Sequence, residues 1–221
     1  KLQLNGLHFA KEHQRYYTVV FKELDALMDL QFINCLFESD SLFDTLPKSI
    51  QLLSMPSCGL DHIHDFKMPF LYSLDLSHNQ VTSLSENTFD SMPSLEYIYL
   101  QDNIISSIES GTFTRLYHLK LVHLSSNHIQ DIPELAFTHD QLYSEDHVNI
   151  RAGDNRWYCG CNLKWMVQSI RKEMYGREDG PFQIHEAMFD MSCLYGLRDF
   201  QYQSLAKIAT DKYEYFLQIC V

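Results

Sequence analysis

Residues 71–81 read LYSLDLSHNQV, and the same pattern returns at 95–105 as LEYIYLQDNII and at 119–129 as LKLVHLSSNHI. In each stretch aliphatic residues stand at positions 1, 4, 6 and 11, and asparagine stands at position 9. Apolar residues two apart, at positions 4 and 6, are typical of a short strand with one buried face. The asparagines recur every 24 residues as Asn79, Asn103 and Asn127. This spacing predicts a row of equivalent units.

Weaker copies extend the row in both directions. Position 9 holds Cys35 in residues 27–37, Cys58 in residues 50–60 and Asn155 in residues 147–157. Residues 2–9 enter the pattern at position 4. A second apolar signal recurs between the units, at Phe21, Leu24 and Leu27, at Phe89, Met92 and Leu95, and at Phe113, Leu116 and Leu119.

This pattern resembles the leucine-rich repeat, which takes Asn or Cys at position 9. Such repeats stack as coils, because one coil cannot bury its apolar faces alone. We therefore expect an α/β solenoid of about seven rungs over residues 1–157, with a parallel sheet on its concave side. Position 9 points into the coil, which accounts for Cys35 and Cys58 as buried free thiols, although a disulfide between these adjacent rungs is the alternative.

The segment NRWYCGCNLKW, residues 155–165, begins where the repeat decays. Cys159 and Cys161 are too close in sequence to bond to each other or to share a zinc ion in the usual spacing. Their candidate partners are Cys193 and Cys220, and four cysteines allow three connectivities. The open end of a solenoid needs a cap, so we expect a capping domain over residues 158–221.

This segment resembles the cysteine-flanked C-terminal cap of Toll-like receptors, Slit proteins and secreted arthropod immune repeat proteins. The match rests on Asn155, Trp157, Cys159, Cys161, Leu163 and Trp165, and it fails at Arg156 and Gly160. The resemblance implies the pairs Cys159–Cys193 and Cys161–Cys220, and disulfides imply an extracellular location. An apolar stripe at Leu163, Met166, Val167 and Ile170 predicts a helix ending near Gly176. The gaps between the cysteines are longer than is usual in the resembled group, which implies an extra loop around 174–190.

At the other end, no cysteine-rich cap precedes residue 2. Two explanations stay open: the chain is the C-terminal part of a longer solenoid, or another polypeptide contacts the uncapped first rung.

In this frame positions 2, 3, 5, 7 and 8 face the concave surface. Tyrosine supplies both an apolar body and a polar tip, as binding hot spots require. The alternative is that any exposed strand shows some of the 13 tyrosines. The candidate binding residues are Tyr72, Asp75, Glu96, Tyr97, Tyr99, Leu121, His123 and Arg151.

Two further segments invite a functional interpretation. Residues 61–65, DHIHD, could bind zinc through His62 and His64, but a solvated turn is the expectation, so no metal site is predicted. Residues 138–147 form a polar insertion after the sixth rung, which either carries contacts or is a tolerated loop.

The net charge of −12 argues against nucleic acid and anionic membranes as partners. No apolar stretch is long enough to span a bilayer, and no motif for catalysis or for a cofactor is present. The pattern favours a non-catalytic extracellular module that binds a protein ligand, with innate immune or developmental signalling implied by the resemblance. A secreted subunit that stabilises, inhibits or carries an enzyme is the alternative, and an adhesion or matrix role comes third.

Overall fold

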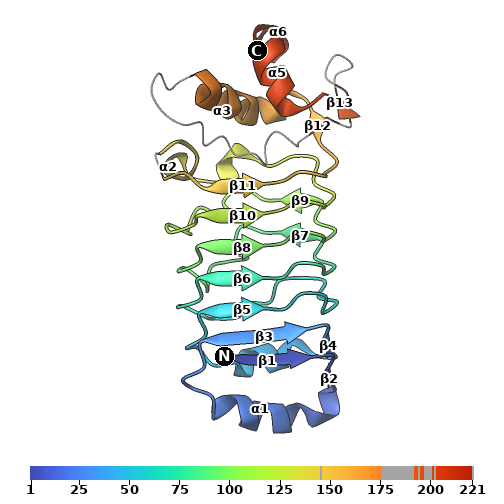
Figure 1. Ribbon diagram of the computed structural model, residues 1–221, viewed down its shortest axis with the longest axis vertical. Coiled ribbons are helices and arrows are strands. Elements are labelled where there is room, and N and C mark those ends of the chain that lie inside the picture. Colours follow the sequence, from blue (N-terminus) through green and yellow to red (C-terminus); the bar gives the residue numbers. More distant parts are fainter. Residues whose placement is uncertain (145, 176–191, 194, 197–200, 202, 221) are drawn as a thin grey trace.

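The computed structural model describes residues 1–144, 146–175, 192–193, 195–196, 201 and 203–220. One parallel sheet of seven strands runs along the molecule, one strand per coil (Figure 1). The fold is the expected α/β solenoid. In order across the sheet, the strands are β1 (Leu2–Asn5), β3 (Asp29–Ile33), β5 (Leu52–Ser54), β6 (Ser73–Asp75), β8 (Tyr97–Tyr99), β10 (Leu121–His123) and β11 (Asn149–Arg151).

The strands pair in the register that the repeat predicts. Position 4 of every strand is aliphatic and, from β3 onward, fully buried, as at Leu74 and Ile98. Position 5 forms a continuous column across the sheet, because each residue pairs with its equivalent in the next coil. That column is Gln3, Gln31, Ser54, Asp75, Tyr99, His123 and Arg151.

Buried asparagines join successive coils. The Asn103 Nδ2 donates to the Leu76 carbonyl of the preceding coil at 3.0 Å and to Leu100 of its own coil at 3.1 Å. Its Oδ1 accepts from the Val81 backbone N–H at 3.0 Å. Since buried backbone groups must be paired, one side chain satisfies both coils at the bend. Three other asparagines at position 9 repeat the arrangement: Asn79, Asn127 and Asn155.

Position 8, just before each position-9 residue, adopts a left-handed backbone conformation. The first coil has Gly6 there, with φ of 65°. The others place small polar residues or histidine at this bend, residue types that tolerate positive φ better than β-branched ones. They are Asn34, Ser57, His78, Asp102, Ser126 and Asp154.

The wall opposite the sheet is built from short elements and phenylalanine rings. Phe113 stacks between Phe89 and Phe137, with ring centroids 5.7 and 4.8 Å away. Two pairs of short parallel strands lie beyond the bend: β2 (His8–Phe9) with β4 (Leu36–Phe37), and β7 (Ser83–Leu84) with β9 (Ser107–Ile108). The helices of this wall are η1 (Lys11–His13), α1 (Gln14–Lys22), η2 (Asp40–Thr45), η3 (Glu134–Ala136) and α2 (His139–Tyr143).

The insertion at 138–147 contains a helix, α2, where a polar bulge was expected. Thr138 and Gln141 form a capping box, in which each side chain bonds the backbone of the other residue. The Gln141 Nε2 also donates to the carbonyls of Phe113 and Leu116 at 2.9 Å. The insertion is therefore tied to the preceding coil.

A separate group of short elements covers the last rung (Figure 1). Cys159 is bonded to Cys193 and Cys161 to Cys220, with Cα–Cα distances of 5.5 and 5.0 Å, which are the pairs that the resemblance implies. The predicted stripe is buried: Leu163, Met166, Val167 and Ile170. Residues 174 and 175 of the expected loop belong to α3, and residues 176–190 lie outside the described residues. The cap comprises β12 (Tyr158–Cys159), η4 (Cys161–Leu163), α3 (Lys164–Tyr175), β13 (Tyr195–Gly196), α5 (Leu205–Asp211) and α6 (Tyr213–Ile219).

The first rung lies at the end opposite the cap (Figure 1). Leu2 and Leu4 are only partly buried there. On α1, the Tyr16 and Val19 side chains are 69% and 61% exposed. This end of the solenoid therefore presents apolar surface.

Candidate binding surface on the concave sheet

The two central tyrosines lie side by side on β8, facing outward from the sheet. Tyr97 pairs with Ser73 of β6 and Leu121 of β10. In the neighbouring column, Tyr99 lies between Asp75 and His123. All of these side chains are partly exposed, while the intervening Ile98 is fully buried. The parallel pairing thus brings six predicted residues into one surface, which we call the tyrosine patch: Tyr72, Asp75, Tyr97, Tyr99, Leu121 and His123.

An ion pair borders the patch. The Lys120 Nζ lies 2.7 Å from the Glu96 Oε2 and 5.9 Å from the centroid of the Tyr97 ring. Its hydrogen bond to Glu96 raises the pKa of Lys120, so the ammonium group stays charged. Lys120 was not among the predicted binding residues, although it shares position 2 with Tyr72 and Glu96.

The Asp75 carboxylate is held in place by hydroxyl groups. The Ser54 Oγ donates to Oδ2 at 3.0 Å, and the backbone N–H and Oγ of Ser77 donate to Oδ1 at 3.0 and 2.7 Å. These bonds fix the carboxylate beside Tyr99, so a ligand meets a preorganised negative charge.

His123 differs from the exposed histidines of the chain. Desolvation is the main cause that lowers the pKa of His123 below the ordinary value of 6.5, and repulsion from Arg151 adds to it. Attraction to Asp102 opposes this shift. The ring is therefore neutral at neutral pH and can both donate and accept a hydrogen bond. Arg151, in the next rung, is exposed.

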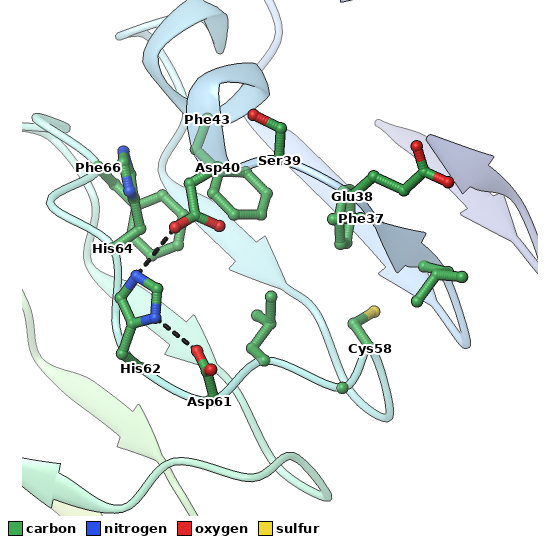
Figure 2. A pocket seen from close by; sticks show the side chains of 13 residues that line it. Phe37, Glu38, Ser39, Asp40, Phe43, Cys58, Asp61, His62, His64 and Phe66 are labelled. Carbon is green, nitrogen blue, oxygen red and sulfur yellow. Dashed lines mark hydrogen bonds and ion pairs between the residues drawn. The ribbon is translucent and has the colours of Figure 1, made fainter. Parts of the chain in front are cut away.

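The histidines of residues 61–65 lie outside the concave sheet, in the third coil. His62 is 57% exposed, as a solvated turn requires, but His64 is only 19% exposed. The expectation of two exposed histidines is therefore wrong for His64, because its ring packs between Phe43 and Phe66. Sequence reasoning also missed Asp40 of η2, whose carboxylate lies 3.0 Å from His62 (Figure 2).

Cys35 and Cys58 are free and buried, as expected from their place in the repeat. The Cys58 Sγ lies 3.4 Å from the carbonyls of Phe32 and Pro56. Burial raises the pKa of Cys58 to about 11, so the group stays a thiol.

Comparison with known families identifies the repeat. The leucine rich repeat family model matches residues 48–105 and 98–139, which include strands β5 to β10. Residues 48–139 therefore consist of leucine-rich repeats, and the seven-stranded parallel sheet continues this fold on both sides of the match. Comparison with curated proteins gives no match. Leucine-rich repeats generally mediate protein–protein recognition and are typically non-catalytic, and their stacking creates an extended concave binding surface.

Among the described residues of the chain, no helix has the length and apolarity to cross a membrane. The partly exposed side chains of the tyrosine patch lie on the concave surface that leucine-rich repeats present to their partners.

Proposed function

We propose that this protein is an extracellular recognition module that binds a protein partner through the tyrosine patch. The observation that carries the proposal is the alignment of Tyr97 and Tyr99 in adjacent columns at the centre of the sheet. Two rigid aromatic rings with hydroxyl tips combine large contact area with low entropy cost. Charged residues at the border, Glu96 and Arg151, would then align the partner rather than supply most of the affinity.

The proposed partner surface is mixed in character. In the patch, Asp75 can accept a hydrogen bond from the partner, and neutral His123 can donate or accept one. Leu121, beside Tyr97, offers a small apolar contact. A complementary protein surface would carry an apolar or aromatic anchor with a basic residue beside it. Such an interface is small and depends on a few strong contacts.

The extracellular location rests on the cap. Two disulfides in one small domain are usual in secreted proteins and ectodomains and rare in the cytosol. The division into a repeat region, residues 1–157, and a capping domain, residues 158–221, is part of the same proposal. The likeness of the capping segment to that of the Toll-like, Slit and arthropod immune group supports a role in innate immune or developmental signalling.

The test is a pair of tyrosine variants with a matched tyrosine control. The multimerised chain is used to probe an array of secreted proteins and ectodomains, and any partner is then titrated against purified variants. Tyr97→Ala/Tyr99→Ala should weaken binding at least about tenfold, because central interface tyrosines are frequent hot spots. Tyr117→Ala, a residue 80% exposed outside the sheet, should leave affinity unchanged. Equal affinity of the double variant and the wild type would reject the patch.

A second function is favoured by the apolar first rung. Tyr16 and Val19 on α1 are exposed, and such side chains are typical of a docking surface. In this alternative the chain is a secreted, non-catalytic subunit that stabilises, inhibits or carries an enzyme. It predicts the reverse pattern, in which Val19→Lys abolishes partner binding while Tyr97→Ala/Tyr99→Ala does not.

A further inference from the structure

Three side chains with metal-binding atoms converge between the second and third coils. Asp40 comes from η2, and His62 and His64 follow β5 in the next coil. One candidate ligand atom from each residue lies within 4.8 Å of the other two. The Asp40 Oδ2 and the His62 Nε2 lie 3.0 Å apart (Figure 2).

A second carboxylate orients His62 from behind. The Asp61 Oδ1 lies 2.6 Å from the His62 Nδ1, on the side of the ring away from Asp40 (Figure 2). In the neutral ring that binds a metal, Nδ1–H donates to this carboxylate, and the lone pair of Nε2 faces Asp40. A histidine that binds a metal through one nitrogen almost always donates its other N–H to such an acceptor.

His64 is held in a fixed orientation by its neighbours. The centroids of Phe43 and Phe66 lie 5.4 and 5.6 Å from the centroid of its ring. Asp44 contributes another carboxylate, 3.4 Å from Nε2. A ligand with few accessible rotamers loses little entropy when it binds a metal.

Asp40 has a defined position as well. It opens η2 directly after Ser39, whose side chain accepts from the Ser41 N–H at 3.3 Å. Asp40, His62 and His64 also line a pocket of about 310 Å³, together with Glu38 and Asp61. Three acidic side chains around two histidines give this pocket a negative charge that attracts a cation.

We propose that Asp40, His62 and His64 bind a Zn²⁺ ion. Two imidazoles and one carboxylate suit zinc, whereas Ca²⁺ and Mg²⁺ prefer oxygen ligands alone. Ligand atoms around tetrahedral zinc lie about 3.4 Å apart. The Asp40 and His62 atoms, now 3.0 Å apart, therefore separate slightly when the ion binds, and any pair near the 4.8 Å limit closes by roughly 1 Å. Exposed His62 and partly exposed Asp40 supply this movement, and the fourth position of the ion opens onto the pocket.

Zinc at this place would tie two successive coils together. A ligand that binds the folded state alone raises its stability in proportion to the logarithm of its concentration above Kd. The ion would act near the first rungs, far from the disulfide-bonded cap, and its open position could accept a water molecule or a side chain of a partner.

The test uses the whole chain with its disulfides intact, stripped of metal with EDTA and dialysed. Titration with zinc chloride in a calorimeter should give one site, and thermal unfolding should shift upward with zinc but not with Mg²⁺ or Ca²⁺. His62→Gln at an exposed position and Asp40→Asn at a partly exposed one should each weaken zinc binding more than about tenfold, and Asp61→Asn by about 10- to 100-fold. His118→Gln, an exposed histidine on another coil, is the control and should bind normally.

Zinc affinity unchanged in both His62→Gln and Asp40→Asn would overturn the site. Cobalt(II) gives a second test, because a tetrahedral nitrogen and oxygen site shows visible d–d bands without thiolate charge transfer. Charge-transfer absorption that disappears in Cys58→Ala would contradict the assigned ligands, since Cys58 lines the same pocket. Normal zinc binding by Tyr97→Ala/Tyr99→Ala separates this site from the proposed recognition surface.

Discussion

The two halves of the solenoid join their coils in different ways. From residue 71 to 155, each position 9 is an asparagine that bonds backbone groups in two coils, as Asn103 does with Leu76 and Val81. In the first three coils the same position holds Leu7, Cys35 and Cys58, and both thiols make only long contacts of 3.4–3.6 Å to carbonyls.

In the first three coils, contacts between aromatic rings replace the asparagine hydrogen bonds that join successive coils. Phe32 lies in the slot of a repeat leucine, and its ring is 5.4 Å from Phe9 and 5.2 Å from Phe37. The contacts continue from Phe37 to Phe43 and from Phe43 to Phe66, at 5.0 and 5.5 Å. The same backbone geometry can therefore be held by polar bonds or by ring packing. The family model matches residues 48–139, which include the coil of Cys58 and leave out the two coils before it.

The largest effect is expected from breaking the aromatic region. Phe32→Ala should lower the free energy of unfolding by about 3–5 kcal/mol, because the fully buried Phe32 ring leaves a cavity beside Phe9 and Phe37. Urea denaturation followed by circular dichroism measures this loss. Phe32→Leu, which restores the usual repeat residue, is the matched variant and should lose less than half as much. Equal losses would mean that the rings add nothing beyond a leucine.

The next effect separates the two kinds of position 9. Asn103→Ala should cost roughly 2–4 kcal/mol, since the carbonyls of Leu76 and Leu100 and the N–H of Val81 lose a buried partner. Cys58→Ala removes weak contacts and should cost only about 1 kcal/mol. Both are measured by the same denaturation. If Cys58→Ala is as costly as Asn103→Ala, the contrast between the halves fails.

The smallest effect concerns the charges at the edge of the aromatic region. A hydrogen bond that the His62 ring donates to Asp61 raises the pKa of His62 above 6.5, and attraction to Asp40 adds to this shift, although desolvation opposes it. The same bond lowers the pKa of Asp61 below 3.8. Protonated His62 therefore stabilises the fold fully below pH 6.5, and this contribution disappears as the pH rises through its raised pKa. At low pH this stabilising contribution is lost as well, because Asp61 takes up a proton when the pH falls through its lowered pKa.

Thermal unfolding in EDTA tests this pH dependence. His62→Gln should be less stable than the wild type at about pH 5 and equally stable at about pH 9. The difference should be small and should shrink in high salt, because both partners are largely exposed. Asp40, Asp61 and, through His64, Asp44 are the acidic groups around the ring. A larger deficit at alkaline pH would contradict the sign.

The sequence predicted the sheet well because its information is local and repeated. Leucines at positions 4 and 6 and a residue at position 9 specify each strand without reference to distant residues, and the register from Gln3 to Arg151 follows. Other signals were present but overlooked. Phe43, Phe66 and Phe137 continue the spacing of Phe21, Phe89 and Phe113, and Thr138 with Gln141 has the spacing of a capping box.

The arrangement of Asp40, His62 and His64 could not be predicted from the repeat pattern. Asp40 and His62 belong to different coils, and their distance depends on the path of η2, which the repeat pattern does not describe. The burial of His64 depends likewise on two rings from separate coils. The tyrosine patch is different, because the columns of the sheet bring its residues together, while its role in binding stays a prediction.

The asparagine bond to the previous coil has an evolutionary consequence. Interior coils offer equivalent groups to both neighbours, so removing residues 80–103 would join Asn79 to Ile104 in the same frame. The shortened chain would still supply a carbonyl and an N–H in the right places for Asn127. Gene segments of this length could thus be duplicated or lost without redesigning the interior. Recognition area would then grow by copying, while specificity would change by substitution in the outward columns.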